Sequence, residues 1–356
     1  MESRATKQDS HNQRSWREML RTVRAAEWWE FKLGPILAII YATAFLLGLS
    51  IISLWPLALI VMVALTACAV YVSVINDFTD RADDMASDKT NRLVGKSLTF
   101  ITTVLAVCIL SGVVVATYWR HEPLLLLLYF TSWAVFTLYS FPPIRLKKRG
   151  GWGVLADACG AHLFPTLLAA AAVYRWTQRP FDAIWFVSIG VWALSFGIRG
   201  ILWHQLNDLP HDKRIDLQTF ARTHKTRSLQ KLGNFIIFPI ELAAFALMLW
   251  RTRCVIAITF VGLYALLNLF RKRFFGSSFC VVMPKSEFHH IVMHEYYEVL
   301  FPLAFILASA NQHPLDLVVL VVHGLLFPKR WKATAMEIAL ILRALWRVAR
   351  SKRSAT

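Results

Sequence analysis

The chain has 356 residues, of which 56% are hydrophobic and only 17% are charged. Soluble globular domains have about 25% charged residues, so this composition argues against an ordinary soluble domain. The formal net charge is +17, from 39 Lys and Arg against 22 Asp and Glu. A basic surplus of this size fits either a nucleic-acid-binding protein or the loops of a membrane protein, and the positions of the charges decide between the two.

Apolar runs dominate the chain after a polar, basic start. Residues 1–32 mix Trp, Leu and Val with Arg, which predicts a basic amphipathic arm at a layer of lipid headgroups. Residues 33–76 include no charged residue, and since one span needs about 20 apolar residues, they predict two membrane spans. Seven further runs follow, at 97–119, 123–144, 158–174, 183–198, 232–250, 254–270 and 299–315. The shorter run at 317–328 predicts a tenth span.

The distribution of positive charge tests this arrangement. Ten crossings would place 33 of the 39 Lys and Arg on one face of the membrane. Without the tenth crossing, the eight basic residues of the tail move to the other face, and the two faces carry 25 and 13. Because positive loops stay in the cytoplasm, both termini and the basic loops are expected there. A charge distributed by membrane side also argues against a nucleic-acid partner. We therefore expect an integral protein of a prokaryotic cytoplasmic membrane, whose partner is the lipid bilayer.

An acidic cluster closes the second predicted span. Asn76, Asp80, Asp84 and Asp88 follow one another at a spacing of four, which places them on one face of a continued helix. Like charges stacked in this way repel each other, so their presence calls for a function. A solvated acidic loop at the end of a helix is the alternative interpretation.

A second acidic cluster closes the sixth predicted span. Asp208, Asp212 and Asp216 again recur at a spacing of four, with His204 one turn earlier. The topology places both clusters on the cytoplasmic face. Carboxylate and amide oxygens are the ligands of Mg²⁺, which commonly bridges to substrate phosphates. The two clusters together predict a magnesium site that holds a lipid diphosphate at the membrane surface.

Three stretches of the chain resemble motifs of the UbiA prenyltransferase superfamily, and the likeness is to its 4-hydroxybenzoate polyprenyltransferases. The matching residues are Asn76, Asp77, Asp80 and Asp84 in the first motif, Tyr139 to Lys147 between the fourth and fifth helices, and Asp208, Asp212 and Thr219 in the second motif. The resemblance covers about residues 33–310. It implies an all-α bundle of nine core spans around a central cavity, with Mg²⁺ as cofactor and an isoprenyl or polyprenyl diphosphate as prenyl donor.

The resemblance implies a role for each matching residue. Asn76, Asp80, Asp84, Asp208 and Asp212 would bind the metal. Asp77 would tune the metal ligands, and Tyr139 would position a substrate group. Apart from the resemblance, several cations of the basic loops could clamp the diphosphate: Arg92, Lys147 and Lys213, which lie in or beside the motifs, with Lys89, Arg145 and Arg214 as weaker candidates. Asp157 is a third catalytic candidate because it is an ionisable residue inside a predicted span: it would serve as a base toward an acceptor of unknown identity, or else pair with a neighbouring cation.

The chain also departs from the family. Lys89-Thr90-Asn91-Arg92 replaces an Arg-Pro that commonly follows the first motif, and Asp216 stands where Gly is usual. Residues 311–356, with the tenth span and a basic amphipathic tail, have no counterpart in the nine-span core. Two other reactions on this fold therefore stay open: phosphoribosyl transfer onto a polyprenyl phosphate, and terpene cyclisation. A non-catalytic transporter or lipid-binding protein is the alternative from another class.

Other polar residues of the apolar runs need separate explanations. Arg199 and Glu241 are expected to form a structural ion pair between helices, because an isolated charge inside a membrane is costly. A cluster precedes the ninth span: His289, His290, His294, Glu295 and Glu298. Its two histidines at a spacing of four could bind zinc, but a polar rim that binds the acceptor, or a cluster at the membrane interface, is the favoured interpretation.

Overall fold

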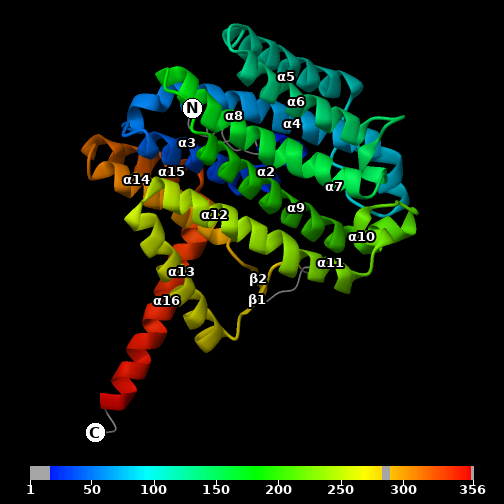
Figure 1. Ribbon diagram of the computed structural model, residues 1–356. Coiled ribbons are helices and arrows are strands. Elements are labelled where there is room, and N and C mark those ends of the chain that lie inside the picture. The colour runs from blue at the N-terminus through cyan, green and yellow to red at the C-terminus, as the bar shows by residue number, and fades with distance from the viewer. Residues whose placement is uncertain (1–16, 283–288, 354–356) are drawn as a thin grey trace, which may run out of the picture.

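The computed structural model describes residues 17–282 and 289–353 (Figure 1). The helical elements are α2 (Ala25–Trp28), η1 (Trp29–Leu33), α3 (Gly34–Leu46), η2 (Ile52–Leu54), α4 (Trp55–Ala86), α5 (Leu98–Tyr118), α6 (Pro123–Ser140), η3 (Leu146–Lys148), α7 (Gly151–Ala158), η4 (Cys159–Leu163), α8 (Phe164–Thr177), α9 (Ala183–Arg214), α10 (Phe220–Thr223), α11 (Thr226–Leu232), η5 (Gly233–Ile237), α12 (Phe238–Thr252), α13 (Val255–Phe275), η6 (Tyr296–Leu300), α14 (Phe301–Ala310), η7 (Pro314–Asp316), α15 (Leu317–Leu326) and α16 (Pro328–Arg353). Strands β1 (Ser278–Cys280) and β2 (His289–Ile291) form a short parallel pair. The predicted all-α bundle is confirmed.

Eight helices in the described residues are long and apolar enough to cross a membrane. They are Ala25–Leu46, Ile52–Ala86, Leu98–Tyr118, Pro123–Ser140, Gly151–Thr177, Ala183–Arg214, Thr226–Thr252 and Val255–Phe275. The predicted ninth and tenth spans correspond to the shorter helices Tyr296–Ala310 and Pro314–Leu326. At 1.5 Å per residue, these two helices are about 20 Å long, against a hydrocarbon core of about 30 Å.

The boundary predicted between an arm and the first span is absent from the structure. Residues 25–46 form one continuous helical segment, and Trp28 is 7% exposed within the core. Glu30 is also buried, and it accepts hydrogen bonds from the backbone N–H groups of Lys329 (3.2 Å) and Arg330 (2.8 Å) at the start of α16. The end of the predicted arm is therefore part of the bundle, while residues 1–16 lie outside the described chain.

Helix α15 runs back along α14 and α3. At one end, Asp316 accepts hydrogen bonds from the backbone N–H groups of Ile51 and Ile52, both 2.9 Å, just after α3. At the other end, the chain reaches Glu30, just before α3. The two ends of α15 thus lie near opposite ends of the first span. This geometry agrees with a tenth crossing, which stays a prediction.

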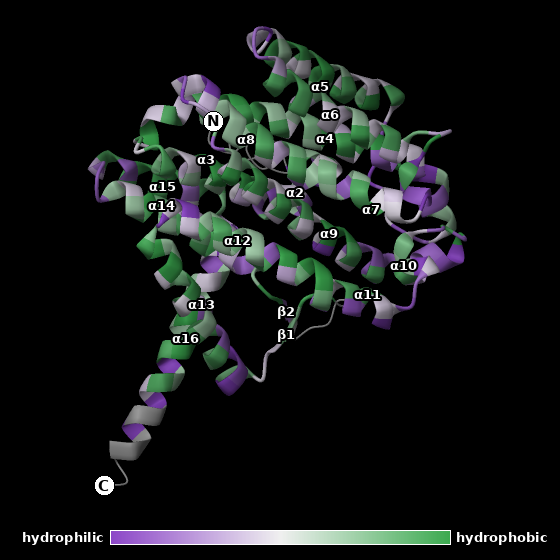
Figure 2. Ribbon diagram, in the orientation of Figure 1, coloured by the Kyte–Doolittle hydropathy of each residue, from purple (hydrophilic) through white to green (hydrophobic). Residues whose placement is uncertain are grey.

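Hydrophobic residues dominate the helices of the bundle (Figure 2), and many large ones are exposed. Helix α5 exposes Leu110 and Val114 at 64% and 69%. At the centre, the alanines 169–172 of α8 are buried and let neighbouring helices approach closely. A helix that is apolar on all sides requires an apolar solvent, so the exposed faces agree with lipid contact.

Four of the described helical segments contain one π-helical turn that ends two residues before a proline: η1, η4, η5 and η6. Proline lacks an N–H, and its ring clashes with the carbonyl group four residues earlier, so the wider turn relieves the conflict. In a regular α-helix, residues five apart point about 140° away from each other. The turn at η4 reduces this angle, and Asp157 and His162 line the same cavity.

Candidate active site

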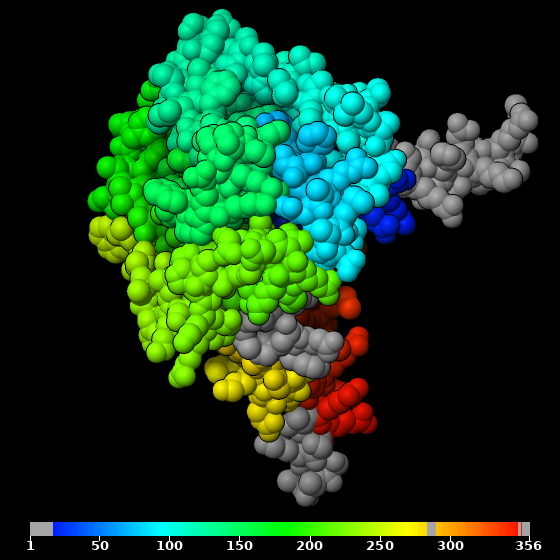
Figure 3. All heavy atoms as spheres, turned by 90° about the vertical axis from the view of Figure 1, so that its right-hand side faces the viewer, coloured from blue at the N-terminus to red at the C-terminus, as the bar shows by residue number. Residues whose placement is uncertain are grey.

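The two acidic motifs lie side by side at one end of the bundle. The first occupies the last turns of α4 and the second the last turns of α9. Lys89, in the loop after α4, places its Nζ 2.7 Å from a carboxylate oxygen of Asp208. His211 Nδ1 lies 3.1 Å from the carbonyl oxygen of Ser87. Figure 3 faces this end and shows the segment after α4 against the segment after α9, so the motifs share one end of the molecule as predicted.

A cavity of about 290 Å³ lies between the motifs. We call it the aspartate cavity, and most of the predicted site residues line it. They are Asn76 and Asp80 on α4, Tyr139 on α6, Lys147 in η3, Asp157 on α7, and Asp208 and Asp212 on α9. Five elements that are distant in sequence therefore supply one polar site.

Two basic side chains neutralise Asp80. Its Oδ1 accepts a 2.7 Å hydrogen bond from Arg145 Nη2 and forms an ion pair with Lys147 Nζ. Lys147 Nζ also lies 3.2 Å from Asn76 Oδ1, and Lys147 is only 6% exposed. Burial lowers the pKa of Lys147, although the Asp80 carboxylate opposes the shift. Lys147 is thus held in the cavity wall, where its ammonium group can move from Asp80 to an incoming anion.

The carboxylates of the second motif differ in exposure. Asp212 is 6% exposed and accepts a 2.9 Å hydrogen bond from Thr219 Oγ1, which explains the threonine after this motif. The Asp208 side chain is 44% exposed and pairs with Lys89. Helix α9 ends at Arg214, so Asp216 leaves the face on which the spacing placed it. It has a φ of 53° and pairs with Arg222 outside the aspartate cavity.

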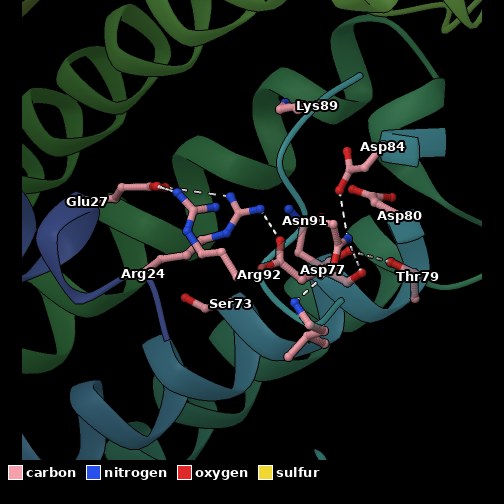
Figure 4. Close-up of polar contacts among 12 residues, drawn as sticks. Arg24, Glu27, Ser73, Asp77, Thr79, Asp80, Asp84, Lys89, Asn91 and Arg92 are labelled. Atoms are coloured by element: carbon pink, nitrogen blue, oxygen red, sulfur yellow. Dashed lines mark hydrogen bonds and ion pairs between the residues drawn. The ribbon is translucent and has the colours of Figure 1, made fainter. Parts of the chain in front are cut away.

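Asp77 and Asp84 do not line the aspartate cavity. Asp77 is fully buried and forms an ion pair with Arg24. The side-chain amide of Asn91 donates to Asp84 Oδ2 (2.8 Å) and to the backbone carbonyl of Asp77 (2.7 Å), and Figure 4 shows these contacts. Residues seven apart share a helix face, so these two aspartates lie together beside the loop that follows α4. In this structure these contacts engage both aspartates, and the direct roles that the motif implies for them stay predictions.

Arg92 and Lys213 also lie outside the aspartate cavity. Arg92 pairs with Glu27, and Lys213 is exposed on α9. The cations that do line the cavity are Arg24, Lys32, Lys89 and Lys147. Arg24 and Lys32 were missed because residues 1–32 were interpreted as a surface arm, and no local motif marks them.

The polar groups of the aspartate cavity suit a hard divalent cation. Asn76, Asp80, Asp208 and Asp212 supply amide and carboxylate oxygens. Among the described residues, no three His, Cys, Asp or Glu side chains converge closely enough to hold a metal ion, and Lys and Arg pair with the carboxylates. Protein Mg²⁺ sites often use one or two carboxylates together with substrate phosphates. The residues present therefore fit Mg²⁺ bound together with a diphosphate.

A second cavity of about 500 Å³ adjoins the aspartate cavity. Five residues line both: Glu27, Lys32, Asp157, Ile201 and His204. His290, His294, Glu295 and Glu298 from the cluster before the ninth span line the second cavity, whereas the side chain of His289 lies outside the described structure. The zinc alternative gains no support from the described part of the chain, where no metal-binding group of three such side chains is found.

The expected ion pair between helices is confirmed. Arg199 on α9 donates two hydrogen bonds of 2.6 Å to the carboxylate of Glu241 on α12. Both side chains are fully buried. Arg199 Nη1 also lies 3.3 Å from the carbonyl oxygen of Val281 and 3.2 Å from that of Val292, next to the strand pair. This pair therefore holds α9, α12 and the strands together beside the second cavity.

The fold and the site define an integral membrane protein whose helical bundle encloses an aspartate-lined cavity at one end. Residues 36–277 match the model of the UbiA prenyltransferase family. This match spans more than half of the chain, so the protein belongs to that family, as the motifs predicted.

Solved structures of a UbiA homolog from Archaeoglobus fulgidus have the same fold. The structure bound to GPP and Mg²⁺ is 13% identical, with a TM-score of 0.52 over 82% of this chain and 99% of that chain. The structure bound to DMAPP and Mg²⁺ is 14% identical, with a TM-score of 0.51 over 82% and 98%. A further structure of a homolog from this organism is 16% identical, with a TM-score of 0.53 over 82% and 99%. No curated protein matches the sequence.

Proposed function

We propose that the protein transfers an isoprenyl or polyprenyl group from its diphosphate to an acceptor, with Mg²⁺ as cofactor and pyrophosphate as product. One observation carries this proposal: carboxylates of both acidic motifs and the buried Lys147 line a single cavity. That combination supplies metal ligands and a cation for the same diphosphate. The homolog structures bound to Mg²⁺ with GPP or DMAPP support the choice of prenyl donor.

The aspartate cavity also accommodates a hydrocarbon tail. Beyond its polar end, it is lined by Ile36 of α3, Leu65 of α4 and Phe136 of α6. A prenyl chain along these side chains would leave water, at a gain of about 25 cal/mol per Å² of apolar surface buried. The diphosphate would meanwhile stay at the charged end. One substrate thus matches both ends of the cavity.

The side chains of the cavity would act on the diphosphate as it leaves. Bound Mg²⁺, held by Asn76, Asp80, Asp208 and Asp212, would supply Lewis-acid stabilisation of the departing oxygens. The ammonium groups of Lys147 and Lys89 would leave their carboxylate partners and pair with the phosphate oxygens instead. The Tyr139 hydroxyl group would orient the diphosphate or the acceptor. These groups act where negative charge develops, which is where electrostatic stabilisation accelerates a reaction most.

Prenyl transfer releases a proton from the acceptor, and we assign Asp157, which lines both cavities, to accept it. The bond from the prenyl carbon to oxygen breaks, and its electron pair leaves with pyrophosphate. The acceptor's nucleophilic atom forms the new bond to that carbon and loses a proton. Asp157 would take this proton as a general base at the boundary between the cavities.

The first test measures pyrophosphate release by the detergent-purified, full-length protein. GPP, DMAPP and longer prenyl diphosphates would be supplied with Mg²⁺ or EDTA, beside phosphoribosyl pyrophosphate with a polyprenyl phosphate. We expect metal-dependent release from a prenyl diphosphate, reduced by about 10²–10³-fold in Asp80→Asn and in Asp208→Asn. Asp88→Asn is the matched control, because this exposed aspartate lies outside the aspartate cavity.

Two outcomes would contradict the proposal. If phosphoribosyl pyrophosphate were the one donor of the panel that is turned over, the activity would be phosphoribosyl transfer and not prenyl transfer. Equal release by wild type and by both cavity variants would separate catalysis from the two motifs. The cytoplasmic orientation of the site is tested independently, by labelling single cysteines in the loop after α4 from either side of the membrane.

A further inference from the structure

The second cavity has no role in the chemistry of the diphosphate. Arg330, Thr334 and Glu337 of α16 line one side of it, and His290 and His294 line another. All of these residues lie beyond residue 277, where the match to the family model ends. The cavity meets the aspartate cavity at Asp157 and His204. A molecule bound there would lie next to the place where the prenyl group is released.

Helix α16 is fixed in position as a wall of this cavity. Arg330 Nε donates a 2.5 Å hydrogen bond to Glu298, and Thr334 Oγ1 donates one of 2.6 Å to Glu295. Arg271 Nε of α13 donates a 2.8 Å hydrogen bond to Glu337. With the backbone contacts of Glu30 at its first turn, α16 is thus held at four successive points along the first three turns. A segment that only touched the bundle would not need this set of partners.

An aromatic cluster forms another part of the wall. Phe196, His162 and His294 line the cavity, and the two histidine rings form T-shaped pairs with Phe196 at centroid distances of 5.1 and 4.8 Å. Trp192, outside the lining, lies parallel to Phe196 at an interplanar angle of 9°. Burial lowers the pKa of His294 well below its usual range, so its imidazole is neutral. His294 Nε2 is buried without a hydrogen-bond partner in the described chain. This wall therefore offers mainly flat aromatic contact.

The charges of the second cavity disfavour an anion. Acidic side chains in its lining outnumber basic ones by five to three. Two of the basic groups are already engaged, Arg271 by Glu295 at 2.5 and 2.9 Å and Arg330 by Glu298. The third, Lys32, also lines the aspartate cavity, where the diphosphate of the prenyl donor would attract it. Four of the five acidic side chains already have a basic partner, since Glu27 pairs with Arg92 and Arg271 also pairs with Glu337. A carboxylate-bearing molecule would therefore find no unengaged cation in this lining except Lys32 and would meet Asp157, which costs binding energy.

We propose that the second cavity is the acceptor site, that α16 is one of its walls, and that it selects acceptors without a negative charge. This inference rests on the proposed function. The acceptor is a molecule with a flat apolar body and a neutral or cationic polar group, and it enters with its nucleophilic atom toward Asp157. The prenyl carbon–oxygen bond breaks as proposed above, and the acceptor's proton goes to Asp157.

Three phenols of similar size test the selection: 4-hydroxybenzyl alcohol, tyramine and 4-hydroxybenzoate, which are neutral, cationic and anionic. Their binding to the detergent-purified, full-length protein is measured by calorimetry with Mg²⁺ and a non-reacting analogue of GPP present, so that no reaction heat is added. We expect the anion to bind at least about tenfold more weakly than the other two. Equal binding of the three, no measurable binding of any, or tighter binding of the anion would overturn the proposal. Because the readout is binding, it does not depend on turnover.

A charge variant sharpens this test. Glu298→Gln releases Arg330 in the cavity, so the ratio of anion to cation binding should rise by about tenfold. Glu18→Gln is the control, since this exposed carboxylate pairs with Lys96 away from the cavity. An unchanged ratio in Glu298→Gln that still binds GPP would contradict the assignment. Loss of GPP binding in the wild type would instead contradict the proposed function, so the two failures are distinguishable.

Discussion

The aspartate cavity takes its four candidate metal ligands from two short motifs at helical spacing, whereas the second cavity takes its polar side chains from elements scattered between residues 27 and 337. In the first, most carboxylates are held by Lys and Arg that a diphosphate can recruit. In the second, the arginines are tied to glutamates and hold the walls in place. The difference indicates that the cations of the aspartate cavity can change partners when a ligand binds, whereas the ion pairs of the second cavity hold its walls in place.

This contrast has a physical basis. A substrate diphosphate brings several negative charges, so its site needs cations that move with little cost from one anion to another. A site for a molecule of low charge gains more from packing and from fixed hydrogen bonds than from mobile ions. Breaking a wall contact should therefore damage the second cavity first, while replacing a mobile cation should damage the aspartate cavity.

The largest expected effect is on the buried ion pair that supports the second cavity. Arg199→Met leaves Glu241 charged and unpaired in the protein interior, and should reduce the free energy of unfolding by about 3–5 kcal/mol. Thermal and denaturant unfolding in detergent would measure it. The double variant Arg199→Met/Glu241→Met should recover much of that loss, because no charge is then stranded.

A partly exposed ion pair provides the control for this cycle. Arg175 pairs with Glu122 in a more exposed position, so Arg175→Met should cost at most about 1 kcal/mol. If the single and double variants at Arg199 and Glu241 unfolded alike, the pair would not be the support that the geometry indicates.

The next effect concerns Lys147, the buried cation of the aspartate cavity. Lys147→Met removes a charge-assisted hydrogen bond to the diphosphate, worth about 1.5–3 kcal/mol, and should raise the KM for the prenyl diphosphate by about 10–100-fold. Steady-state kinetics of pyrophosphate release would measure it. Arg24→Met tests whether any other cation of the cavity is equivalent.

The pH dependence of this step follows from the lowered pKa of Lys147. The charged form of Lys147 binds the diphosphate, so the affinity for the prenyl diphosphate is highest below this pKa. It falls as the pH rises through the pKa, and the fall begins at a lower pH than for an ordinary lysine. Lys147→Arg should keep its charge at every accessible pH and abolish this alkaline decline. A wild-type affinity that stays constant up to the ordinary range of lysine would contradict the assignment.

The smallest effect is expected at Asp77, which the motif assigned to catalysis and the structure places behind the cavity. Asp77→Asn leaves Arg24 without its ion-pair partner, and should lower kcat/KM by about tenfold, a loss of about 1.4 kcal/mol. Asp80→Asn should lose far more. Equal losses in these two variants would restore Asp77 to the catalytic group.

Much of the site could be predicted because a helix converts sequence spacing directly into shared faces. Asn76 and Asp80, and likewise Asp208 and Asp212, line the aspartate cavity as their spacing of four requires. The same rule failed at Asp216, because α9 ends two residues earlier. It was incomplete at Asp84, because Asn91 from the following loop binds that carboxylate. Periodicity shows which residues share a face but not which partner meets that face.

The sequence by itself determined the all-helical membrane class, the family, the shared end of the two acidic motifs and the pairing of Arg199 with Glu241. Each depends on composition, on local spacing, or on the high cost of an unpaired charge in an apolar interior. Only the tertiary structure brought Arg24 to Asp77, placed Glu30 at the start of α16 and joined α16 to Glu295 and Glu298 as a cavity wall. Contacts between segments up to about 300 residues apart leave no local pattern, because they arise from how helices pack and not from the period of any one helix.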